Sequence, residues 1–354
     1  MSQRVKHILI TAGGTGGHVF PALSVAKSLT AKGHKVTWLG TKRGIESRVV
    51  PESGIEIEYI SVEGLRGQSK ASLVLAPFKL TRAIIEAVIV IRRLNPDCVV
   101  GFGGFVAGPG GIVARMLAKP LVIHEQNSVA GLTNRWLAKF ATRVLTGFPS
   151  VVDFGHKSVW VGNPVRESII PKEQGKRGRI RILVVGGSQG AHSFNMKLPK
   201  VFSELGVDLK IKHQSGLGKA KQVRALYELN QLNAKVVEFI DDMAAAYQWA
   251  DLLVCRAGAM TIAECCAARK PALLIPYPFS AGDHQIHNAN TLVDAGAAEM
   301  VLNHKIDSTE IFSALQRLVA DRARLQKMGA NAGALHKPNA TGLVVSAISE
   351  VLNA

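Results

Sequence analysis

The feature that most limits the fold of this chain is a strand that runs through glycines toward a helix, and it occurs twice. Residues 8–18 read ILITAGGTGGH and residues 182–192 read ILVVGGSQGAH. Aligned without gaps, they share an isoleucine, a leucine, two glycines and a final histidine. Eleven positions do not prove a duplication, but the same strand, glycine turn and helix begin each half.

Short β-branched runs alternate with helical patterns after each turn, which predicts βαβ units and hence parallel sheets covered by helices. A chain of 354 residues exceeds what one core usually fills, so we expect two α/β domains. The alternation stops near residue 162 and restarts at residue 182, which places the domains at residues 1–163 and 164–339. Strands are predicted at 7–11, 35–39, 55–60, 98–101, 121–124, 143–146, 182–185, 209–213, 236–240, 252–255 and 272–275. Helices are predicted at 20–31, 73–94, 131–138, 308–327 and 340–352.

The charge of the chain favours an anionic partner, since the formal net charge is +17. Nucleic acid, an anionic membrane and a phosphorylated substrate all fit, and so does a merely solubilising surface. Aromatic residues make up only 6% and are not interleaved with cations, which argues against a single-strand nucleic-acid platform.

The four cysteines form no C-x-x-C pair, which favours buried, reduced thiols in a cytoplasmic protein. The N-terminus shows no signal peptide, and no run of about 18 apolar residues predicts a membrane span. No spacing of His, Cys or Asp predicts a metal site, and Asp241-Asp242 is better interpreted as a helix cap.

Both glycine turns predict anion sites, because a strand turning into a helix directs backbone N–H groups and the helix dipole at one point. Neither turn is a dinucleotide fingerprint, since Val19 stands where G-x-G-x-x-G needs glycine, and neither is followed by G-K-[ST]. His18 ends the first turn, where an imidazole can take a proton from an alcohol. A structural histidine is the alternative.

Further polar and glycine-rich segments follow predicted strands. The glycines of residues 101–111 indicate a close backbone approach, and residues 124–127 (HEQN) suit hydroxyl recognition or form a solvated loop. In the second half, Glu264 lies among small apolar residues, where it fits either a ribose diol or the dipole of a helix start. Asp283 is predicted to cap the helix that carries the polar residues 285–288.

An apolar segment with flanking cations, residues 73–80, has the composition of an interfacial membrane anchor. A buried helix with lysines reaching the solvent is the equal alternative. The predicted membrane patch comprises Leu75, Phe78, Lys79 and Arg82.

Several of these motifs together resemble the bacterial MurG family, the N-acetylglucosaminyltransferases of peptidoglycan synthesis. The resemblance covers nearly the whole chain and is carried by residues 13–18 with Pro21, 103–111, 124–127, 162–166, 186–191, and 257–264 with Gln285. It implies a GT-B fold, in which two Rossmann-like parallel-sheet domains face a cleft and the last helix, 340–354, packs back on the first domain. The implied reaction moves GlcNAc from UDP-GlcNAc to the MurNAc C4 hydroxyl of lipid I, undecaprenyl-diphosphate-MurNAc-pentapeptide, with inversion to give lipid II.

The resemblance also implies the roles of individual residues. His18 is the candidate general base, and Thr15, Gly16 and Gly17 serve the acceptor diphosphate. The donor-binding residues are expected to be Asn127, Arg166, Ser188, Ile240, Ala259, Met260, Thr261, Ile262, Ala263, Glu264 and Gln285, with Gly190 and Asn288 as possible additions. Phe105 stands where family members often carry Tyr, and Met116 joins Leu75 and Phe78 in the apolar patch where relatives can have tryptophans.

The resemblance implies a peripheral enzyme at the cytoplasmic face of the inner membrane, taking part in cell-wall synthesis, cell shape and cell division. Its expected partners are UDP-GlcNAc, lipid I, an anionic membrane surface and other cell-wall proteins, with no nucleic acid and no required cofactor. The alternatives are a UDP-GlcNAc 2-epimerase, a non-catalytic nucleotide- or RNA-binding module, and a Rossmann dehydrogenase, which the failed fingerprint weakens.

Overall fold

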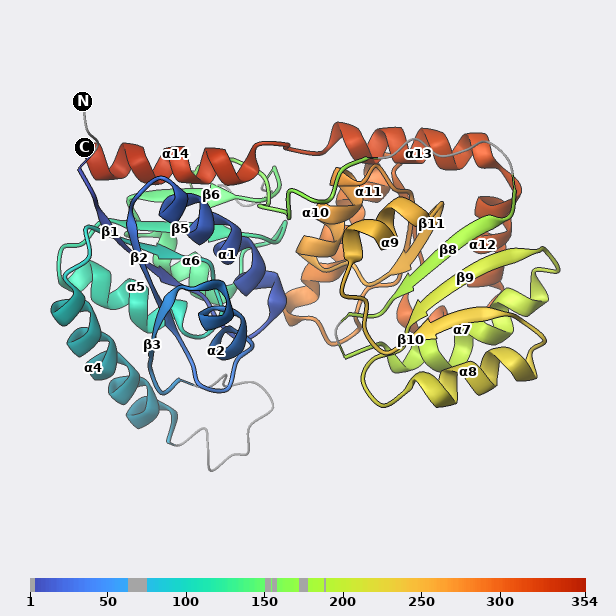
Figure 1. Ribbon diagram of the computed structural model, residues 1–354, viewed down its shortest axis with the longest axis horizontal. Coiled ribbons are helices and arrows are strands. Elements are labelled where there is room, and N and C mark those ends of the chain that lie inside the picture. The colour runs from blue at the N-terminus through green and yellow to red at the C-terminus, as the bar shows by residue number, and fades with distance from the viewer. Residues whose placement is uncertain (1–3, 63–74, 150–153, 155–157, 172–177, 188) are drawn as a thin grey trace. The chain divides into compact units, whose positions relative to one another are not determined.

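The computed structural model describes residues 4–62, 75–149, 154, 158–171, 178–187 and 189–354. The chain divides into two compact units (Figure 1). Unit 1 comprises residues 1–165 and the C-terminal residues 339–354, and unit 2 comprises residues 166–338. The division therefore lies two residues beyond the one expected from the sequence, and the last helix belongs to unit 1.

Unit 1 is built on a seven-stranded parallel sheet with the order β3-β2-β1-β4-β5-β6-β7. In β1, Ile8 pairs with Val36 on one side and with Cys98 on the other. The strand order reverses between β1 and β4, so ligands are expected at the carboxyl end of β1. The strands are β1 His7–Thr11, β2 Lys35–Gly40, β3 Glu56–Tyr59, β4 Cys98–Gly101, β5 Leu121–Glu125, β6 Arg143–Thr146 and β7 Ser158–Trp160.

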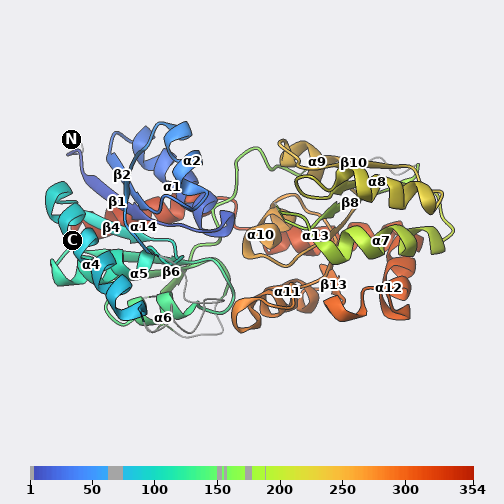
Figure 2. The same ribbon diagram turned by 90° about the horizontal axis from the view of Figure 1, so that it is seen from below.

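Helices cover both faces of this sheet because the strand residues alternate in direction and both sets are apolar. Ile8 and Ile10 pack against α1 and α14, whereas Leu9 packs on the side of α4, α5 and α6 (Figure 2). The helices are α1 Gly16–Ala31, α2 Glu46–Val49, η1 Pro51–Ser53, α4 Ala76–Leu94, α5 Ala107–Met116, α6 Leu132–Ala138 and α14 Ala340–Asn353.

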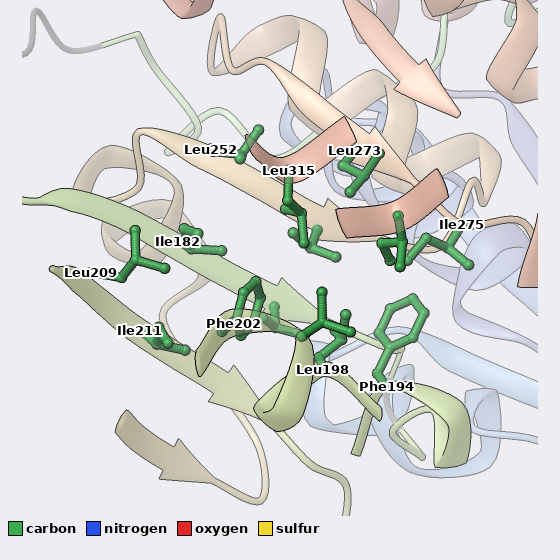
Figure 3. Close-up of a cluster of buried hydrophobic side chains, with 14 of the residues drawn as sticks. Ile182, Phe194, Leu198, Phe202, Leu209, Ile211, Leu252, Leu273, Ile275 and Leu315 are labelled. Carbon is green, nitrogen blue, oxygen red and sulfur yellow. The ribbon is translucent and has the colours of Figure 1, made fainter. Parts of the chain in front are cut away.

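Unit 2 repeats the architecture with a six-stranded parallel sheet, in the order β10-β9-β8-β11-β12-β13. On one face, Phe194, Leu198 and Phe202 of α7 pack with Ile182 and Leu273 in the core that Figure 3 shows. The strands are β8 Ile180–Val185, β9 Leu209–Gln214, β10 Ala234–Val237, β11 Leu252–Cys255, β12 Ala272–Leu274 and β13 Ala298–Met300. The helices are α7 His192–Glu204, α8 Ala220–Leu229, α9 Met243–Trp249, α10 Ala259–Ala267, η3 Ala281–Asp283, α11 His284–Asp294, η4 Asn303–Lys305, α12 Thr309–Ala320 and α13 Arg322–Ala334.

Some local predictions need correction. The single helix predicted at 308–327 is two helices, because Asp321 leaves the helical conformation (φ −126°, ψ 98°) and its side chain caps Arg324 N of α13. Asp283 is not a capping residue: it adopts a left-handed φ of 52° and its side chain makes no cap hydrogen bond to α11. The short strands β7 and β13 escaped prediction because neither is an apolar β-branched run: β7 (SVW) is largely exposed, and β13 (AEM) contains a glutamate and no β-branched residue.

Two other predictions are confirmed. All four cysteines are buried and free, and Asp242 caps α9 by accepting a hydrogen bond from Ala245 N at 2.9 Å.

Candidate functional site

The first glycine turn connects β1 to α1 at the carboxyl edge of the unit 1 sheet. Thr15 is the N-cap of α1, without a side-chain cap bond, and Gly16 and Gly17 are the first residues of the helix. His18 follows within the first turn of α1 and is half-buried. The structure therefore brings the predicted acceptor residues and the predicted base onto one helix start.

The His18 ring is held through one nitrogen. Nδ1 lies 3.0 Å from the carbonyl oxygen of Phe102 and 3.2 Å from Oε1 of Gln126. The Gln126 amide is oriented by its own Nε2, which donates to the Phe102 carbonyl at 2.8 Å. Because both neighbours of Nδ1 are acceptors, Nδ1 carries the proton, and Nε2 of the neutral ring keeps its lone pair. An unprotonated nitrogen is what a general base needs.

The glycine-rich loop after β4, residues 101–111, packs closely against the first glycine turn and His18. A Cβ on Gly103 would lie 2.9 Å from His18 Nδ1, and a Cβ on Gly104 would lie 2.2 Å from the carbonyl oxygen of Gly13. Both glycines have a positive φ, 90° and 79°. The close approach that the sequence indicated is thus made to the first turn and to His18.

Residues 124–127 turn out to be mostly internal. His124 donates from Nε2 to the Gly162 carbonyl at 3.0 Å, and burial lowers its pKa to about 4. Glu125 accepts four hydrogen bonds, from Asn127 N and Nδ2, Gly131 N and Asn134 Nδ2. With its oxygens engaged in this way, Glu125 is not available as a base. Of the four residues, only Asn127 is partly exposed, so the alternative of a solvated loop is wrong, and hydroxyl recognition stays a prediction for Asn127.

The second glycine turn connects β8 to α7 in unit 2 and is packed against the loop that follows β9. A Cβ on Gly190 would lie 1.9 Å from the Ser215 carbonyl oxygen, so two backbones touch here. Gln214 Nε2 donates to the Gly187 carbonyl at 3.0 Å, and Lys219 Nζ donates to the Gln189 carbonyl at 2.8 Å. Ser188, the predicted diphosphate contact, lies outside the described residues.

Glu264 lies on α10 with a side chain that is only 13% exposed. Its Oε2 accepts from the hydroxyl of the fully buried Tyr247 at 2.8 Å, and Oε1 lies 3.7 Å from Arg166 Nη2. Burial raises the pKa of Glu264, while Arg166 and then Tyr247 lower it in part. The structure thus brings together two predicted donor residues, and it adds Tyr247, which the sequence did not identify.

The remaining predicted donor residues occupy the carboxyl side of the unit 2 strands. Gln285 on α11 accepts from Tyr277 N at 2.8 Å. Asn288 is fully buried and donates to the Ala257 carbonyl at 3.1 Å, so its side chain supports the loop before α10. Ala259, Met260, Thr261, Ile262 and Ala263 form the first turns of α10, where Ile262 is fully buried, and Ile240 is buried just after β10.

Arg256 is a half-buried cation directly after β11 that sequence reasoning missed. Its Nη1 donates to the carbonyls of Ile275 and Pro276 and to Asn303 Oδ1, and its Nη2 donates to Ser193 Oγ. Burial lowers its pKa to about 10. A charged residue directly after an apolar strand was the available signal. Arg256 joins the start of α7 to the loop after β12.

Two observations on the described residues concern metal sites and membrane spans. Within the described ranges, no group of three or more His, Cys, Asp or Glu side chains is placed to hold a metal ion. Over the same ranges, no helix is both long and apolar enough to cross a bilayer.

Comparison with known proteins gives a consistent result over the full length. Residues 8–146 match the glycosyltransferase family 28 N-terminal domain, and residues 181–343 match its C-terminal domain. A protein of Marinobacter nauticus is 45% identical over 358 residues, covering 98% of both chains. It is named UDP-N-acetylglucosamine–N-acetylmuramyl-(pentapeptide) pyrophosphoryl-undecaprenol N-acetylglucosamine transferase.

Solved structures agree with this match. The crystal structure of Acinetobacter baumannii MurG has a TM-score of 0.84 at 40% identity, covering 98% of this chain and 99% of that one. A Listeria monocytogenes structure described as a UDP-N-acetylglucosamine 2-epimerase has a TM-score of 0.70 at 13% identity, covering 98% of this chain and 96% of that one. At 13% identity, the similarity to the Listeria monocytogenes structure concerns the fold alone.

Proposed function

The chain belongs to glycosyltransferase family 28, and on this premise we propose that it transfers GlcNAc from UDP-GlcNAc to the MurNAc C4 hydroxyl of lipid I, forming lipid II. The observation that carries the proposal is the full-length similarity, at 45% identity, to a transferase named for this reaction. The arrangement of His18 supports it, because a base is present where the acceptor is expected.

The proposed chemistry is a single displacement with inversion. His18 Nε2 takes the proton of the C4 hydroxyl as that oxygen forms its bond to the anomeric carbon, and the bond from this carbon to the UDP oxygen breaks. The charge on the leaving diphosphate is stabilised by the N–H groups and the dipole at the start of α7. The ribose hydroxyls donate to Glu264, whose buried carboxylate needs such partners.

The test is transfer from labelled UDP-GlcNAc with and without a lipid I analogue. Release of UDP and formation of the labelled disaccharide only with the acceptor is the expected result. Epimerisation of UDP-GlcNAc without the acceptor would instead support the 2-epimerase, and RNA binding without turnover would support a binding module. No cofactor is required in this proposal, and the rate before and after treatment with EDTA decides whether a divalent ion takes part.

The localisation proposal is a peripheral position at the cytoplasmic face of the inner membrane. Phe78, Ile85 and Ile89 follow one face of α4 and are 74%, 55% and 59% exposed. On α6, Trp136 is 59% exposed, with Lys139 Nζ 4.2 Å from its ring centroid. Arg82, Lys79 and Leu75 add charge and apolar surface at the start of α4. Such a mixture of exposed apolar and cationic side chains suits an anionic lipid surface.

Co-sedimentation with phosphatidylglycerol vesicles tests this surface. Ile89→Glu is expected to weaken vesicle binding about tenfold, because it removes an exposed apolar side chain that would be buried in the lipid and adds repulsion. Val207→Glu, at an exposed apolar position of unit 2, is the matched control and should leave binding unchanged. Equal losses in both variants would argue against α4 as the contact.

A further inference from the structure

A buried carboxylate lies directly behind the first glycine turn. Glu46, on the short helix α2, is fully buried. Its Oε2 accepts from Gly14 N at 3.1 Å, and its Oε1 accepts from Thr41 N at 3.0 Å and from the Thr41 hydroxyl at 2.7 Å. A buried carboxylate is tolerated only where donors satisfy it, and here one donor is the turn itself.

Glycines around Glu46 leave the space that its side chain occupies. A Cβ on Gly13 would lie 2.6 Å from Glu46 Oε1, and a Cβ on Gly44 would lie 1.9 Å from Oε2. A Cβ on Gly40 would lie 2.9 Å from Glu46 Cγ. Part of the glycine signature of this turn is therefore required by the carboxylate and not by a phosphate.

We propose that Glu46 is a positioning residue for the acceptor half of the reaction, which makes this inference rest on the proposed function. Gly14 has a φ of 91°, and the bond to Glu46 fixes the backbone there. Thr15 caps α1 immediately afterwards, so fixing Gly14 fixes where α1 begins and where His18 stands. The same bond withdraws the Gly14 N–H from any ligand, which leaves anion contacts at this turn to the first N–H groups of α1.

The contrast with the second turn supports this role. In unit 2 the corresponding turn is held from behind by the amide of Gln214 and the ammonium of Lys219, both acting on carbonyl oxygens. Those two contacts use carbonyl oxygens and not N–H groups of the turn, and they place a positive charge beside it. A negative charge behind one turn and a positive charge behind the other make a diphosphate anion favour the second. The two glycine turns have similar sequences but differ in electrostatics, because Glu46 contacts the first and Lys219 contacts the second.

The primary test is Glu46→Gln in the full chain, assayed with varied acceptor and varied donor. The glutamine can still accept from Thr41, but its NH₂ group would face the Gly14 N–H, so that bond is lost. We expect kcat/KM for the acceptor to fall about 10- to 100-fold while the donor KM stays within about twofold. Glu52→Gln, an exposed glutamate of the adjacent η1, is the matched control and should match the parent. An unchanged acceptor kcat/KM, or a donor KM that rises in parallel, would overturn the proposal.

Two further measurements keep the proposal testable if Glu46→Gln does not fold. Thr41→Val removes one of the donors to Oε1 and should lower acceptor kcat/KM in the same direction but less, again without changing the donor KM; an unchanged value counts against Glu46. In the parent protein, the Gly14 amide should exchange at least about tenfold more slowly than an unstructured glycine, although Gly14 is exposed. Unprotected exchange at Gly14 overturns the role of Glu46, whereas absence of transfer by the parent protein contradicts the proposed function instead.

Discussion

The hydroxyl of Tyr247 offers a sharp test of how the donor half works. Tyr247 is fully buried and donates at 2.8 Å to Glu264, the carboxylate proposed to accept from the ribose hydroxyls. Tyr247→Phe deletes this single hydrogen bond and leaves the ring, so the packing of α9 is preserved. The donor should then bind a carboxylate that has lost one partner.

The size of the effect follows from the surroundings of Glu264. A hydrogen bond to a charged group contributes about 1.5–3 kcal/mol. The Glu264 side chain is 13% exposed, and Arg166 Nη2 lies 3.7 Å away, so water and this cation compensate in part. The bond exists with and without the donor, so only the part that orients and ionises Glu264 enters the affinity; its upper limit, about 1.5 kcal/mol, corresponds to at most a tenfold weaker donor affinity.

Isothermal titration with UDP-GlcNAc measures that affinity directly. Tyr227→Phe is the matched control, because its hydroxyl is equally buried in unit 2 but bonds to His213 Nδ1 at 2.9 Å. Both variants should lose stability, yet only Tyr247→Phe should lose donor affinity. Equal donor affinity in the two variants would refute the link between Tyr247 and ribose binding.

The pH dependence gives a second readout of the same bond. Burial raises the pKa of Glu264. The ribose contact needs the ionised form, so donor affinity should rise as pH increases through this pKa. Tyr247→Phe raises the pKa further and should move the profile to higher pH. The stability from this group has the opposite sign: it is complete below the unfolded pKa of about 4.3 and is lost as pH rises through the folded pKa.

Other variants test separate parts of the structure. His18→Ala should lower kcat by about 10²- to 10⁴-fold with little change in donor KM, and an unchanged kcat in steady-state assays would remove it as the base. Gly190→Ala places a Cβ 1.9 Å from the Ser215 carbonyl at a φ of 70°, so thermal unfolding should show a loss of more than about 2 kcal/mol. Asp321→Ala removes the cap of α13 and should cost about 1 kcal/mol in denaturant unfolding, with activity retained.

The fold was predictable because short β-branched runs, typical of strands, alternate clearly with helical patterns along the sequence. An apolar strand that leads into a glycine turn and a helix predicts a central parallel strand, and β1 and β8 do lie in the interior of their sheets. It failed where a tertiary contact decides the local structure. Asp321 ends a helix inside a continuous apolar pattern because its side chain caps the next one, and periodicity does not detect such a break.

The candidate site was predictable only for residues next to a motif. His18 follows a glycine-rich turn and Glu264 follows a turn of small residues, and each was identified from the segment around it. Tyr247 and Glu46 were missed because they act across the fold, from α9 and α2, on atoms of other segments. Residues 124–126 were misjudged for the opposite reason: their polarity serves internal hydrogen bonds, which a linear pattern cannot separate from contacts to a ligand.

The last helix of the chain has a consequence for synthesis. Val344, Val345 and Ile348 of α14 complete the same core as Ile8 and Ile10 of β1. During translation, the strands and helices of unit 1 up to residue 165 are synthesised long before α14, so this part of the core stays uncovered until the helix at 340–353 is made. Unit 1 therefore contains both the first and the last segments of this sequence to be synthesised. A chain truncated after residue 338 should therefore leave exposed the apolar face of unit 1 that α14 covers in the whole chain.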